Sequence, residues 1–108
     1  MTNVSIFHAP EAERLADLMA EVNRDHKLGL VQRKHRVPRP NNDDGSFIKE
    51  GYRTAMHNIG SWPYADPNYH LPGDTAARVD VANAALTTKA ILAAVLRIDA
   101  GWLLEHPA

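Results

Sequence analysis

The chain has 108 residues, of which 44% are apolar and 23% are charged, and its formal net charge at pH 7 is -1. This length fits one domain with a modest core, and the composition is that of an ordered globular protein. Since the chain has no cysteine, disulfides, thiolate metal sites and cysteine nucleophiles are excluded.

Arginine outnumbers lysine eight to four, and alanine supplies sixteen residues. This bias is typical of a GC-rich bacterial genome or of a phage of such a host. The chain contains neither a signal-peptide pattern nor a run of about eighteen apolar residues. We therefore expect a cytoplasmic protein without a membrane role, found in the host cytoplasm or the virion if a phage encodes it.

The first predicted element is a helix over about residues 10–27. Pro10 suits its first turn, and Gly29 follows as a stop signal. Apolar residues recur there at the spacing of one helical face: Leu15, Leu18, Met19 and Val22. The preceding residues 3–7, NVSIF, fit either a short strand or an apolar arm.

An extended basic arm is predicted over residues 28–45. Residues 24–39 hold six of the twelve lysines and arginines against one aspartate, and Pro38 and Pro40 oppose a helix. Such an arm can pair with an acidic surface of its own chain or a neighbouring subunit, with nucleic-acid or nucleotide phosphates, or with an acidic foreign protein. The candidate contacts are Arg33, Lys34, Arg36 and Arg39.

The middle of the chain predicts a turn at residues 41–46, a helix over about residues 46–59, and a proline-rich loop over residues 60–73. The helix is suggested by Ile48, Tyr52, Met56 and Ile59 along one face. In the loop, the aromatic rings fit either packing onto the helix junction or contact with a partner. These rings are Trp62, Tyr64 and Tyr69.

A long helix is predicted over about residues 74–100, because no proline or glycine occurs between Ala76 and Gly101 and alanine and leucine dominate. Its second half is apolar nearly all round, and two other helices can hardly cover it in so short a chain. We expect a homo-oligomer or a protein partner there. The candidate interface residues are Leu92, Val95, Leu96, Trp102 and Leu103.

Patterns for catalysis are weak. A metal site for a small hydrolase would draw on the histidines and aspartates around the loop, namely His57, Asp66, His70 and Asp74, but they lack ligand spacing such as His-x-x-x-His. Paired carboxylates for a magnesium pyrophosphohydrolase, a calcium loop, a glycine-rich phosphate cradle and a nucleophile elbow are missing as well. The sequence therefore predicts no enzyme, no metal and no cofactor.

The predicted fold is a small all-α domain of three helices with a long irregular proline-rich middle segment. The predicted function is that of a non-enzymatic binding or assembly protein, which oligomerises or docks through its apolar C-terminal helix while the basic arm anchors a partner. Two alternatives stay open. One is a nucleic-acid or nucleotide binding module using residues 24–39, and the other is a small metal-dependent hydrolase.

Overall fold

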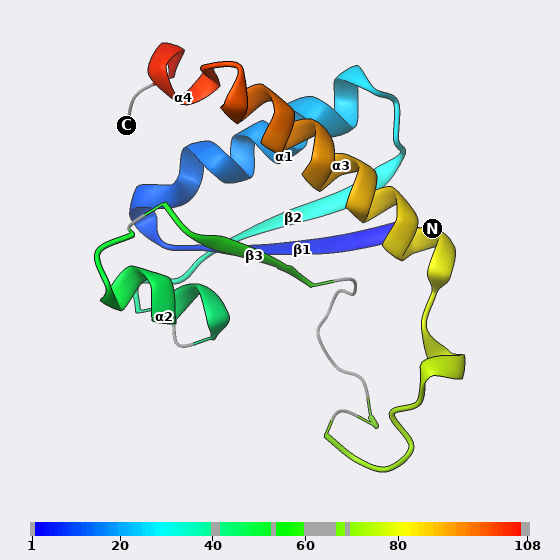
Figure 1. Ribbon diagram of the computed structural model, residues 1–108. Helices are drawn as coiled ribbons and strands as arrows, with labels where there is room; N and C mark the ends of the chain where they lie inside the picture. The colour runs from blue at the N-terminus through cyan, green and yellow to red at the C-terminus, as the bar shows by residue number, and fades with distance from the viewer. Residues whose placement is uncertain (1, 40–41, 53, 60–66, 69, 107–108) are drawn as a thin grey trace.

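The computed structural model describes residues 2–39, 42–52, 54–59, 67–68 and 70–106. Within these residues a sheet packs with helices, so the all-α prediction is wrong (Figure 1). The strands are β1 (Thr2–His8), β2 (Leu30–Arg36) and β3 (Met56–Ile59). The helices are α1 (Glu13–Asp25), α2 (Asp43–Lys49), α3 (Val81–Asp99) and α4 (Trp102–Glu105), with the 3-10 helices η1 (Pro10–Ala12) and η2 (Ala76–Arg78).

The described strands form one mixed sheet in the order β2-β1-β3. Strand β1 is parallel to β2, which requires the crossover that α1 provides, and antiparallel to β3. The start of β2 is tied to α1, because the Asn23 side chain donates to Leu30 O and accepts from Leu30 N. Residues 3–7 are thus part of the central strand, which is the first of the two possibilities that the sequence allowed.

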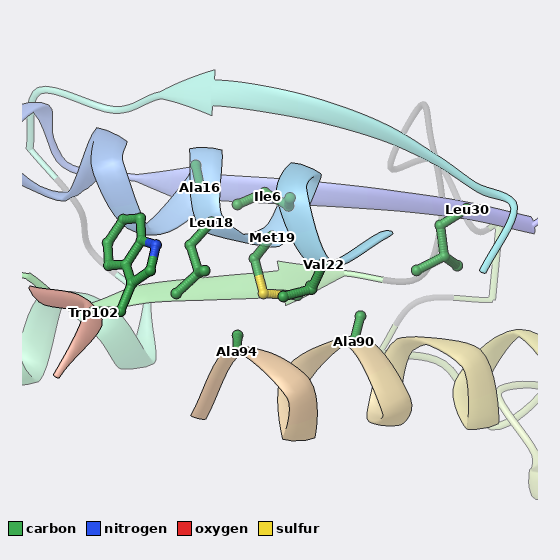
Figure 2. Packing of buried hydrophobic residues seen from close by; sticks show 9 residues of the cluster. All are labelled: Ile6, Ala16, Leu18, Met19, Val22, Leu30, Ala90, Ala94 and Trp102. Atoms are coloured by element: carbon green, nitrogen blue, oxygen red, sulfur yellow. The ribbon is translucent and has the colours of Figure 1, made fainter. Parts of the chain in front are cut away.

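Helices α1 and α3 pack against each other over one face of the sheet (Figure 1). Ala90 and Ala94 lack bulk, so α3 comes close to the apolar side of α1, as Figure 2 shows. Covering each large side chain of this core contributes about 1.5–3 kcal/mol. The buried members are Ile6, Ala16, Leu18, Met19, Val22, Leu30, Ala90, Ala94 and Trp102.

Two further predictions about elements are corrected by the structure. The helix expected over about residues 46–59 ends at Lys49, and the backbone at Gly51 has a φ of 96°, which is incompatible with its continuation. Residues 56–59 are β3 instead. The arm expected over residues 28–45 is not free either, since residues 30–36 are an edge strand and residues 43–45 open α2.

The long C-terminal helix starts later than expected. Asp80 caps α3 by accepting a hydrogen bond from Asn83 N at 2.9 Å, and residues 74–80 are irregular apart from η2. At the other end Gly101 has a φ of 103° and turns the chain into α4. Helix α3 therefore runs for 19 residues without a break.

Candidate functional site

The outward side of α3 is the most prominent surface feature among the described residues. Only Asn83, Ala90 and Ala94 of this helix are buried. On its opposite side Leu92, Val95 and Leu96 are exposed by 57%, 53% and 59%. We call the exposed residues of this side the α3 face: Val81, Ala84, Ala85, Thr88, Ile91, Leu92, Val95 and Leu96.

Thr88 does not interrupt the apolar character of the α3 face. Its hydroxyl Oγ1 donates to Ala84 O at 2.8 Å, within the same helix. Because this donor is already used within the helix, covering Thr88 at a contact leaves no donor without a partner. The α3 face therefore offers a strip along the helix with no charged group between Val81 and Leu96 apart from Lys89 at its margin.

A shallow groove adjoins the α3 face. Its volume is about 340 Å³, and it lies between α3 and the turn that joins α1 to β2. The turn contains two residues with left-handed backbone, Lys27 with a φ of 51° and Gly29 with a φ of 73°. The groove is lined by His26, Leu28, Lys89, Leu92, Ala93 and Leu96. The apolar surface thus continues from the helix into a concave region.

Arg97 fixes the orientation of α3 on α1. Its Nη2 lies 2.8 Å from Asp25 Oδ2, and its Nη1 lies 3.7 Å from Glu21 Oε2. The hydrogen bond from Arg97 is the main cause that lowers the pKa of Asp25 below its ordinary value. These ion pairs lie beside the helix contact and add to the packing of Ala90 and Ala94, which leaves the opposite side of α3 facing outward.

Two of the predicted interface residues are covered within the chain. Trp102 is buried in the core, and its ring stacks on His106 with centroids 4.3 Å apart. Leu103 packs against the same core. Their neighbour Leu104 is the outward residue of α4, with 88% of its surface exposed. The turn at Gly101 thus separates the C-terminal residues from the α3 face.

The basic residues predicted as contacts are all exposed, and Lys34 is also paired with acids of α1. Lys34 Nζ lies 2.7 Å from Asp17 Oδ1 and 3.1 Å from Glu13 Oε1, and these hydrogen bonds raise its pKa above the ordinary value. Lys34 is thus paired within its own chain. Arg33 and Arg36 on β2, and Arg39 just beyond it, are exposed side chains.

The sheet face opposite α1 and α3 carries a row of stacked rings. The ring of Phe7 lies between His35 and His57, with centroid distances of 4.8 Å and 5.3 Å. Burial, followed by the charges of Arg33 and His8, lowers the pKa of His35. One ring comes from each strand, so sheet pairing creates a cluster that sequence reasoning missed.

Asp44 of α2 meets this row at His57. Its Oδ1 accepts from Gly45 N at 3.0 Å and lies 3.1 Å from His57 Nδ1, at an angle outside the hydrogen-bond range. The carboxylate is buried, and its Oδ2 has no hydrogen-bond partner among the described residues. The contact ties α2 to the sheet, and nothing in the turn-like pattern around Asp44 had suggested a buried acid.

The predicted metal site is not assembled by the described residues. His57 contacts Asp44, while His70 and Asp74 are exposed in the turns that precede η2. Within the described part of the chain, no three His, Asp or Glu side chains are grouped to hold a metal ion. Asp66 and the three predicted aromatic contacts Trp62, Tyr64 and Tyr69 lie outside the described residues.

Helix α3 is also long and apolar enough to cross a membrane, with a mean hydropathy of 1.5. Mostly buried core helices meet the same criterion, whereas 17% of the apolar window of α3 is buried. Here α3 packs on α1 through Ala90 and Ala94 and is tied to it by Arg97, as expected of a helix belonging to a folded domain.

No family model, no curated protein and no solved structure matches this chain. Two surfaces therefore carry the functional argument: the α3 face with its groove, and the exposed arginines at β2.

Proposed function

We propose that this protein is a non-enzymatic binding or assembly protein that docks onto another protein through the α3 face. The observation that supports the proposal is the exposure of Leu92, Val95 and Leu96 on one side of a helix whose other side is fixed in the core. A contiguous apolar patch of this kind is typical of an interaction surface. No cofactor and no metal belong to this proposal.

A protein fits the α3 face better than a lipid surface does. Helices that lie on membranes carry lysines and arginines along their polar side, which attract anionic headgroups. The other side of α3 is instead packed in the core, and Arg97 is paired with Asp25 and Glu21. Asp80 and Asp99 stand at the two ends of the helix, where they would repel anionic lipids.

Charge reversal on the α3 face tests the proposal. Leu92→Glu combined with Leu96→Glu should abolish binding to protein partners, because two carboxylates would be buried at the contact. Leu71→Glu is the matched control, since Leu71 is exposed by 55% but lies in a turn before η2. The measurements are light scattering for self-association and affinity capture from the source cells. If the unaltered protein is monomeric and captures no other protein, the proposal is wrong.

The exposed arginines support a second candidate function, namely binding to nucleic-acid phosphates. Arg33, Arg36 and Arg39 lie on or just beyond the edge strand β2, where a phosphate backbone can approach. Binding of a single-stranded oligonucleotide should weaken steeply between 50 and 200 mM salt, on the order of tenfold or more. Arg36→Ala with Arg39→Ala should weaken it further, whereas Lys34→Ala, which removes a cation already paired with acids, should change it little. Salt-independent binding, or none, would exclude this function.

A further inference from the structure

We infer that the occupant of the α3 face is a second copy of this chain, whose α3 lies antiparallel to the first about a two-fold axis. The inference rests on the proposed function and names its partner. It follows from the spacing, the size gradient and the extent of the exposed residues.

The spacing along the α3 face is that of a helix seam. Val81, Ala85, Thr88, Leu92 and Val95 follow one another at alternating intervals of four and three residues. This is the repeat that keeps two helices in contact along their length, with side chains of one inserted between those of the other. All of these residues are exposed. A seam with this repeat favours a single helix as the partner over a flat sheet or a lipid surface.

The sizes of the side chains determine the direction of that partner helix. After Val81 the first half of the α3 face is small, with Ala84, Ala85 and Thr88, and the second half is large, with Ile91, Leu92, Val95 and Leu96. A parallel copy would place small side chains against small ones, which leaves voids, and large side chains against large ones. An antiparallel copy about the helix midpoint sets Leu92, Val95 and Leu96 against Thr88, Ala85 and Ala84, while Ile91 lies beside the two-fold axis.

Full overlap of two α3 helices gives a specific register. With the axis at the midpoint of Val81–Asp99, Ala85 faces the partner's Val95, and Thr88 faces the partner's Leu92. Asp99 then approaches the partner's Asp80. Both acids are at exposed helix ends, where water and salt screen their repulsion, and Asp80 already accepts from Asn83 N.

The extent of the surface suits a small dimer. Helix α3 is about 28 Å long at 1.5 Å per residue, and the groove beside His26 and Leu28 widens the contact. A stable dimer buries about 800 Å² per copy, and the groove adds to the area that one side of a helix supplies. We therefore expect dissociation in roughly the micromolar range.

Cysteine cross-linking tests the register directly, because the natural chain has no cysteine. We would make Ala85→Cys and Val95→Cys as separate proteins and oxidise each alone and the two mixed. In the antiparallel register, the two copies of position 85 are about 15 Å apart along the axis, too far for a disulfide, whereas positions 85 and 95 face each other. Linked dimers should form in the mixture and not in either protein alone.

The other outcomes separate the inference from the proposed function. Cross-linking of each single variant with itself would overturn the antiparallel arrangement while self-association stands. If light scattering finds a monomer at about 100 µM, well above the expected dissociation range, the occupant of the α3 face is not a second copy of the chain. If a different protein is then captured through α3, the proposed docking function still holds. Both positions are exposed, so circular dichroism should show unchanged folding of the variants.

Discussion

Truncating Leu92 to alanine should weaken self-association without destabilising the monomer. Burying a whole leucine side chain contributes about 1.5–3 kcal/mol. Because 57% of Leu92 is exposed in the single chain, covering it at an interface contributes about 1–1.7 kcal/mol per copy. A two-fold dimer loses this contribution twice, or about 2–3.4 kcal/mol, which corresponds to a roughly 30- to 300-fold rise in Kd.

The assay compares two quantities on the same protein. Sedimentation equilibrium over a concentration series gives Kd, and urea denaturation of dilute monomer gives the free energy of unfolding. The Kd should rise as stated above. The free energy of unfolding should change by no more than about 0.5 kcal/mol, since an exposed side chain contributes little to the fold. The control Leu104→Ala also removes an exposed leucine, one that lies on α4, and should leave Kd unchanged. An unchanged Kd for Leu92→Ala, or equal effects of both variants, would refute the reasoning.

Three further predictions concern the fold. Leu18→Ala should lower the free energy of unfolding by about 2–5 kcal/mol in urea denaturation, because Leu18 is fully buried, and a loss under 1 kcal/mol would contradict the described core. Asp44→Ala should cost about 1–3 kcal/mol in thermal unfolding by removing the acid beside His57, whereas Asp44→Asn, which still accepts from Gly45 N, should cost less; equal losses would argue that the hydrogen bond from Gly45 N contributes nothing to stability. The pKa of His35 lies below its ordinary value of 6.5, so the folded chain resists its protonation and stability should fall as pH drops through that value. His35→Gln should flatten this pH dependence of unfolding, and an unaltered slope would contradict the assignment.

The sequence identified α1 and most of α3, left residues 3–7 open between a strand and an apolar arm, and did not assign β2 or β3 to a sheet. Helix α1 was predictable because Leu18, Met19 and Val22 share one face, all of which are buried. Strand β2 was not, because its inward positions after Leu30 are polar. Gln32 donates to Met19 O, and Lys34 meets acids of α1, so these side chains are satisfied only by tertiary contacts.

Strand β3 was missed for a different reason. In Met56–Ile59 the two apolar residues are three positions apart, which also fits one face of a helix. Only pairing with β1 decides between the two structures. The same dependence on distant partners explains the ring row of Phe7, His35 and His57, which no local pattern indicates.

The candidate surface was predictable in part. Leu92, Val95 and Leu96 were singled out because an apolar helix in a short chain lacks enough neighbours to cover it, and they are exposed. Trp102 was included on the same ground but is buried. Its position depends on the left-handed backbone of Gly101, which turns α4 back onto the core.

The positive charges on β2 affect how many copies of the protein can join through the edge of the sheet. Strand β2 is an edge of the sheet, and an edge can recruit further strands without limit, which leads to fibres. Arg33 and Arg36 place like charges on both faces of this edge, so a second β2 is repelled. Pairing of helices about a two-fold axis, by contrast, closes after two copies. The charges on β2 thus keep open-ended growth at this edge unfavourable while the α3 face remains available for a finite complex.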